Sequence, residues 1–85
     1  MQVNVTQEHI QRGVMGDECY CPVALAIKAV AERRCVYVNN RHITLVSEEF
    51  GVEHTSDTPH EVASFIDRFD KACPVQPFSF TLSLL

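Results

Sequence analysis

The sequence predicts an α+β fold in which helices pack on one face of a mostly antiparallel sheet, in the order β-α-α-β-β-(β)-α-β. Residues 78–84 alternate strictly and put four large apolar side chains on one face, which is typical of a half-buried strand. Residues 23–34 and the residues after Pro59 instead space their apolar side chains as amphipathic helices do. The chain of 85 residues is expected to form a single domain, 1–85, because it is too short for two independent cores.

The N-terminal elements are expected to be short. Val3 and Val5 alternate with polar residues, which predicts a strand with one buried face. Thr6 is a suitable cap for a short helix over residues 7–12, and Gly13 is a natural stop for it.

The second helix, over residues 23–34, is expected to be the central one because it is apolar over more than half of its circumference. Pro22 occupies a position that is favoured in the first turn of a helix. One bulky stripe of this helix is formed by Val23, Ile27 and Val30.

A β-hairpin is expected from two runs rich in β-branched residues, 35–38 and 42–46, joined by a two-residue turn at 39–40. This register sets Tyr37 opposite His42. The apolar side chains that then share one face are Val36, Val38, Ile43 and Leu45.

The C-terminal half begins with an irregular edge strand over residues 49–54, followed by a loop over 54–57. Thr58, Pro59 and Glu61 then combine three signals for the start of a helix. The apolar stripe of that helix consists of Val62, Phe65, Ile66 and Phe69. The segment between this helix and the last strand contains two prolines and is expected to be extended.

Charge and hydropathy exclude several classes of protein. The formal charge is −4, from 11 acidic and 7 basic side chains, and the basic residues are scattered apart from Arg33 and Arg34. This pattern argues against nucleic acid as the main partner, because a phosphate-tracking stripe is missing. No signal peptide or membrane-spanning run is visible, so no membrane partner and a cytoplasmic location are expected, with reduced cysteines.

Four cysteines and four histidines raise the question of a metal site. Cys19 and Cys21 are separated by one residue, whereas zinc sites usually have two to four, and no second pair completes a tetrahedral set. We therefore expect no metal and no cofactor. Cys35 and Cys73 are interpreted as buried or half-buried free thiols.

Cys21 is the strongest candidate for a ligand-binding or reactive residue, with Tyr20 beside it in the loop. It stands where the cap of the central helix should be, and there the free amides and the helix dipole would lower the pKa of a thiol. The base would be one of four histidines, His9, His42, His54 and His60. The alternative is a structural loop in which Asp17 and Glu18 already satisfy the helix terminus.

Two surfaces are further candidates. Tyr37 and His42 lie on the outward, hydroxyl-rich face of the sheet and are candidates for binding a polar ligand, although such faces are commonly just solvated. Leu25 and Ala29 interrupt the polar side of the central helix, and Phe50 lies on the expected edge strand.

Leu25, Ala29 and Phe50 together define a candidate protein interface, and a two-fold homodimer through Leu25 is one way to cover it. The competing explanation is that the N-terminal helix covers Leu25 within one chain.

Two blocks of sequence carry a family resemblance. The first is the helix start Cys21-Pro22-Val23-Ala24-Leu25-Ala26, and the second runs through Phe65-Ile66-Asp67-Arg68-Phe69-Asp70 to Pro77-Phe78-Ser79-Phe80. Together with a Val5-Thr6 start that continues to Ile10 and Gly13, the pattern resembles a group of short bacteriophage and prophage proteins.

The resemblance implies a phage origin and carries no catalytic residues to this chain. Small phage accessory proteins act by binding a host protein or by sequestering a small signalling molecule, with counter-defence as one such role. A non-enzymatic binding module in the host cytoplasm is therefore the expected function. A thiol-dependent enzyme that uses Cys21 and a structural or assembly component are the alternatives.

Overall fold

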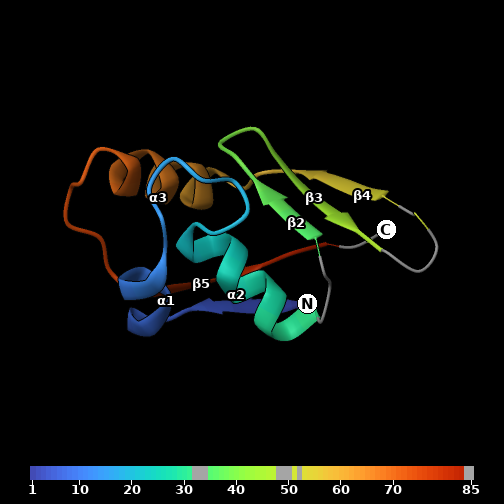
Figure 1. Cartoon of the computed structure of the whole chain (residues 1–85), viewed down its shortest axis with the longest axis horizontal. Coiled ribbons are helices and arrows are strands. Elements are labelled where there is room, and N and C mark those ends of the chain that lie inside the picture. The colour runs from blue at the N-terminus through green and yellow to red at the C-terminus, as the bar shows by residue number, and fades with distance from the viewer. Residues whose placement is uncertain (32–34, 48–50, 52, 84–85) are drawn as a thin grey trace.

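The computed structural model describes residues 1–31, 35–47, 51 and 53–83, and it has the predicted α+β class and element order. Figure 1 shows the arrangement. The elements are β1 (Gln2–Val5), α1 (Gln7–Arg12), α2 (Pro22–Ala31), β2 (Cys35–Val38), β3 (His42–Val46), β4 (Glu53–Asp57), α3 (His60–Asp70) and β5 (Phe78–Thr81).

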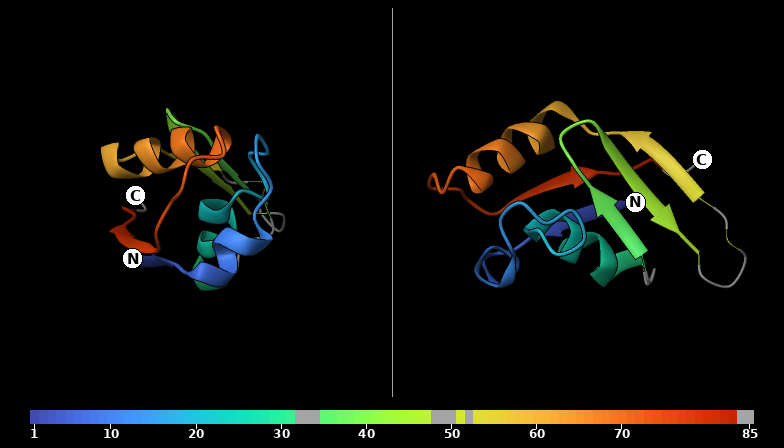
Figure 2. Two further views of the ribbon diagram at one scale, coloured as in Figure 1. Left: turned by 90° about the vertical axis from the view of Figure 1, so that its left-hand side faces the viewer. Right: turned by 45° about the horizontal axis from the view of Figure 1, so that its top comes forward.

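The strands form two antiparallel sheets, whereas a single sheet was expected. The first and last strands pair with each other, with Val3 opposite Phe80, and β2, β3 and β4 form the second sheet. Helix α2 contacts both β1 and β2 and so lies between the two sheets (Figures 1 and 2). A helix that is apolar over more than half of its circumference can bury two sides at once, here one against each sheet.

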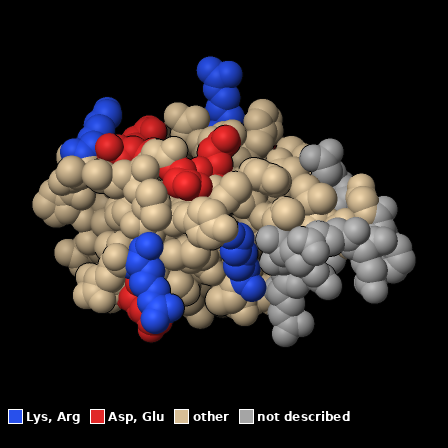
Figure 3. All heavy atoms as spheres, in the orientation of Figure 1, with Lys and Arg blue, Asp and Glu red and all other residues tan. Residues whose placement is uncertain are grey.

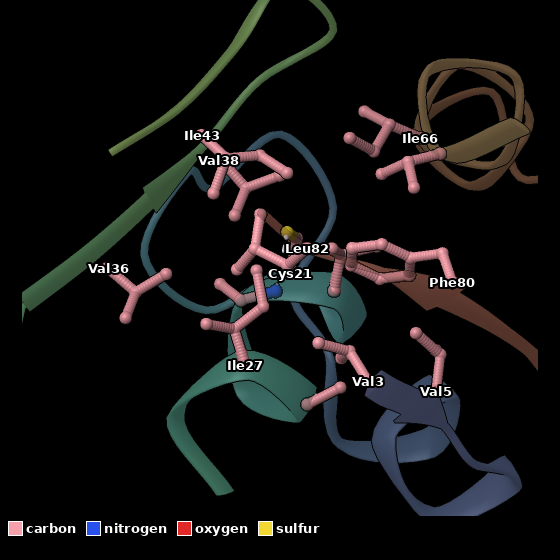
Figure 4. Close-up of a cluster of buried hydrophobic side chains, with 14 of the residues drawn as sticks. Val3, Val5, Cys21, Ile27, Val36, Val38, Ile43, Ile66, Phe80 and Leu82 are labelled. Atoms are coloured by element: carbon pink, nitrogen blue, oxygen red, sulfur yellow. Dashed lines mark hydrogen bonds between the residues drawn. The ribbon is translucent and has the colours of Figure 1, made fainter. Parts of the chain in front are cut away.

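One core joins the two sheets and the helices. Figure 4 shows side chains from β1, β5, α2, β2, β3 and α3 pointing toward one another. The fully buried members of this core include Val3, Ile27, Val36, Ile43 and Leu82. The alternation that predicted the strands is confirmed, since Val3, Val5 and Phe80 are buried while their polar neighbours are exposed.

The first two turns of α2 carry its buried residues. Val23 and Ile27 are fully buried, as the stripe predicted, but Val30 in the last turn is 45% exposed. Ala24 and Ala26 take its place in the core. The prediction for Val30 is wrong because a helical stripe gives the direction of a side chain but not how far the neighbouring elements extend along the helix.

The β2–β3 hairpin has the predicted face and a different register. The turn is centred on residues 40–41, with the amide of Asn39 donating to the carbonyl of His42 (3.1 Å). Tyr37 therefore lies opposite Thr44 and not opposite His42. The Oδ1 atom of Asn39 accepts the amides of Arg41 and His42, both at 2.8 Å, which fixes the turn one residue later than expected.

The segment 54–57, expected to be a loop, belongs to strand β4. It pairs with β3 so that Thr44 lies opposite Thr55 and His42 opposite Asp57. Its polar sequence has low strand propensity, so the pairing with β3 rather than local preference makes it a strand. The edge strand expected over 49–54 lies partly outside the described residues.

The predicted start of helix α1 is confirmed. The Thr6 hydroxyl accepts the amide of His9 (3.3 Å), and His9 Nδ1 accepts the amide of Thr6 (3.0 Å), which completes a reciprocal cap. The helix ends at Gly13 as predicted, although the backbone there is extended and not left-handed (φ −65°).

Thr58 does not cap α3, contrary to the prediction. Pro59 is the cap residue, and it makes no side-chain hydrogen bond. The Thr58 hydroxyl instead donates to the carbonyl of Asn39 (2.8 Å), and the Thr58 amide donates to the carbonyl of Arg41 (3.0 Å). Tertiary bonding to the hairpin turn therefore takes the hydroxyl that the local pattern assigned to the helix.

Helix α3 ends in a Schellman turn. Ala72 has a positive φ of 59°, its amide donates to the carbonyl of Phe69 (3.0 Å), and the amide of Cys73 donates to that of Arg68 (2.9 Å). The segment 73–77 that follows has no regular secondary structure and leads the chain back to β5.

Candidate functional site

An acidic cavity of about 180 Å³ lies between the loop that precedes α2, helix α3 and the hairpin turn. Its lining residues include four carboxylates and two amides: Asp17, Glu18, Asp67, Asp70, Asn39 and Asn40. All four carboxylates accept hydrogen bonds, Asp17 from amides of its own loop. Asp70 accepts the amide of Gly16 (3.0 Å), Glu18 accepts the Asn39 side chain (2.8 Å), and Asp67 accepts the Asn40 side chain (3.4 Å).

Cys21 lies in the wall of this cavity and caps α2, as its position predicted. Its Sγ accepts the amide of Ala24 (3.4 Å), and the residue is 5% exposed, with the sulfur pointing into the core (Figure 4). Asp17 caps its own loop by accepting the amides of Cys19 and Tyr20 (2.9 and 3.1 Å). The terminus of the helix is therefore satisfied by the thiol and not by the acidic residues.

The expected lowering of the Cys21 pKa is wrong. Burial raises the pKa of this thiol, and the nearby charges of Asp70 and Asp17 raise it further. The amides of Ala24 and Val23 act in the opposite direction and are outweighed. The thiol is therefore protonated at neutral pH, which is the unreactive form.

We expect Cys21 to be modified last when the native protein is treated with iodoacetamide near pH 7.5. Cys73 is exposed, so its interpretation as a buried or half-buried thiol is wrong. It should react at least about tenfold faster than Cys21, because a thiol needs access and thiolate character to react. Peptide mass spectrometry over time gives both rates, and in urea the difference should disappear. Preferential modification of native Cys21 would instead support the thiol-dependent alternative.

The other ligand-binding candidates do not gather around Cys21. Tyr20 is 55% exposed and packs its ring beneath the Lys28 ammonium, 4.3 Å from the ring centroid. Tyr37 is 41% exposed on the outer face of the three-stranded sheet. His42 lies on that face beside Asp57, with 3.8 Å between Nε2 and Oδ1. The structure therefore separates a buried thiol from an exposed sheet face.

The interface candidates form only part of a described surface. Leu25 is half-buried and Ala29 is exposed, whereas Phe50 lies outside the described residues. Helix α1 packs against α2, and its Ile10 is half-buried against the core. Leu25 is therefore less open than a free interface residue would be.

A second hollow, the aromatic groove, lies between α3 and the segment that precedes β5, and has a volume of about 600 Å³. It is formed by the apolar residues Phe65, Val75, Pro77 and Phe78 and the polar residues His60, Glu61, Ser64, Arg68 and Gln76. Figure 2 shows the segment running from the end of α3 to β5. The Phe65 and Phe78 rings are in contact, with 4.8 Å between centroids.

Sequence patterns did not identify this groove. Phe65 and Phe78 read as core residues, and Ser64 and Arg68 read as a solvated helix face. The signal that pointed toward it is Pro74 and Pro77, because two prolines keep a segment extended beside a helix without a ladder of hydrogen bonds.

On the face shown in Figure 3, acidic and basic side chains are scattered, some of them side by side, over a surface that is mostly uncharged. Within residues 1–31, 35–47, 51 and 53–83, no group of three or more His, Cys, Asp or Glu side chains is placed to hold a metal ion. No helix in the described part of the chain has the length and apolar character needed to cross a membrane.

Comparison with protein-family models, with curated proteins and with solved structures gives no match to this chain.

Proposed function

We propose that this chain is a non-enzymatic binding protein that recognises a partner protein in the aromatic groove. The groove itself is the observation that supports the proposal. Its volume of about 600 Å³ falls within the range of binding sites. It combines an apolar floor at Phe65 and Phe78 with a polar rim, the usual composition of a recognition surface.

The chemistry of the two hollows supports binding over catalysis. Cys21 is buried, and the pKa of its thiol is raised. The groove holds one imidazole and one hydroxyl, His60 and Ser64, and no hydrogen bond joins them within the described part of the chain. A nucleophile that is not hydrogen-bonded to a base is a poor basis for covalent catalysis.

The biological setting that we propose is the one implied by the resemblance to short phage proteins. The chain would be a phage accessory protein in the host cytoplasm, and its partner a host protein, with counter-defence as one such role. A homodimer through Leu25 and Ala29 stays a prediction.

The test fills the groove without disturbing the core. Ser64 is exposed and lines the groove, so Ser64→Arg should block it, whereas Gln11→Arg adds the same side chain at an exposed position on α1. Tagged wild type and both variants are used to capture proteins from a bacterial host lysate. We expect a partner that is retained by wild type and Gln11→Arg and lost from Ser64→Arg, with native mass spectrometry giving its mass.

Identical capture by all three proteins would place the binding surface outside the groove. Circular dichroism and urea melts of both variants show whether each is folded, so that a lost partner is not mistaken for lost structure. A retained small molecule in place of a protein would contradict the proposed class of partner.

A further inference from the structure

The apolar part of the aromatic groove is suited to receive a single apolar side chain. Phe78 is half-buried, and Phe65, which contacts its ring, is 7% exposed. Val75 is half-buried and packs against the same core. A partner side chain inserted here would complete the burial of these surfaces, which is the favourable term in most recognition.

The charge of Arg68 on the rim of the groove indicates which polar group a partner would place beside its apolar side chain. Arg68 is exposed, lines the groove and forms no ion pair with any residue that the structure describes. A guanidinium binds a carboxylate with two parallel hydrogen bonds. Glu61 lines the groove seven residues earlier on α3, about 10 Å away along the helix, and it repels an anion from that end. The charges therefore favour a carboxylate at the Arg68 end.

The free backbone of the opposite wall favours an extended chain. No hydrogen bond joins the backbone of Val75 or Gln76 to another residue in the described part of the molecule. Both residues line the groove, and Gln76 is exposed. Unpaired amide and carbonyl groups along a groove are what an added peptide strand uses for its main-chain hydrogen bonds.

We infer that the aromatic groove binds an extended segment of a partner protein in which an apolar side chain lies within a few residues of an acidic one. The apolar side chain packs on Phe78, the carboxylate binds Arg68, and the backbone of the segment bonds to Val75 and Gln76. This inference rests on the proposed function and adds the chemistry of the partner segment to it.

The experiment selects random peptides displayed on yeast against the full chain. Wild type is compared with Arg68→Glu, which reverses the charge in the groove, and with Lys71→Glu, which makes the same change at an exposed position of the following turn. We expect wild type and Lys71→Glu to enrich peptides with an apolar residue close to Asp or Glu. Arg68→Glu should instead enrich Lys or Arg at the acidic position.

Synthetic copies of the enriched peptides then give affinities by fluorescence anisotropy. Arg68→Glu should lower the affinity for the peptide selected on wild type at least about tenfold, whereas Lys71→Glu should change that affinity less than about twofold. Added salt should reduce the difference between the two variants. The small acid 3-phenylpropionate, which has the apolar and anionic groups but no peptide backbone, should bind far more weakly.

Three results would overturn the inference. Enriched peptides without an acidic residue, blocked by Ser64→Arg, would leave the groove as the site but reject the carboxylate. Equal binding by 3-phenylpropionate would reject the extended chain. Peptides that bind Ser64→Arg as well as wild type would reject the inference and the proposed function together.

Discussion

Replacing Phe80 with alanine is expected to lower the free energy of unfolding by about 3–5 kcal/mol. Phe80 is 4% exposed, lies opposite Val3 across the two-stranded sheet and contacts Phe78 with 5.9 Å between ring centroids. The loss combines the transfer of a large ring out of water with the cavity left in the core cluster. A domain of this size has roughly 5 kcal/mol of stability, so the variant should be largely unfolded at 37 °C.

Thr81→Ala provides the matched control, because Thr81 is the next residue of the same strand and is exposed. Its cost should stay below about 1 kcal/mol. Urea melts followed by circular dichroism measure both changes. If Phe80→Ala leaves no folded baseline, Phe80→Leu keeps part of the volume and should give a measurable intermediate loss. Equal destabilisation by Phe80→Ala and Thr81→Ala would contradict the burial of alternate residues in β5.

Gly13→Ala is expected to lower the free energy of unfolding by about 1–3 kcal/mol through overpacking. The backbone at Gly13 has φ −65° and ψ 148°, which alanine adopts freely, so backbone strain is not the cause. A Cβ at this position would lie 2.4 Å from Cδ, 2.5 Å from Cγ and 2.7 Å from the backbone N of Pro22. The end of α1 would have to move away from the first turn of α2, on which it packs.

A double-mutant cycle tests this explanation. Pro22→Ala removes the two ring carbons that meet the new Cβ, so the double variant should be less destabilised than the sum of the single changes, by at least about 0.5 kcal/mol. Thermal or urea melts of the four proteins give the coupling. Strict additivity would show that the ring carbons of Pro22 are not the cause of the destabilisation, because the backbone N at position 22, 2.7 Å from the added Cβ, is present in both backgrounds.

Hydrophobic alternation predicted which face of each strand is buried, but it did not determine the register of the hairpin. The observed register differs by two residues from the expected one, with Val38 opposite Ile43. A shift of two returns every side chain to the same face, so the apolar pattern fits both registers equally well. The choice between the two registers depends on Asn39. Its side chain accepts hydrogen bonds from two amides of the turn, and its carbonyl accepts one from the Thr58 hydroxyl at the start of α3.

The candidate site was less predictable than the fold. The position of Cys21 at the start of α2 followed from the order of residues, but its pKa depends on burial and on Asp70, which is distant in sequence. The aromatic groove joins Arg68 and Phe65 of α3 to Phe78 beyond the helix. The sequence of α3 and the sequence around Phe78 do not show, each by itself, that the two segments face each other across a hollow.

The sequence by itself determined the helices, four of the five strands and the buried face of each predicted strand, because these depend on local propensity and on periods of 3.6 and 2 residues. Only the tertiary structure decided the division into two sheets around α2, the strand character of the polar segment Glu53–Asp57, the hairpin register and the groove. Each of these depends on contacts between residues far apart in the chain, whose energies no local pattern contains.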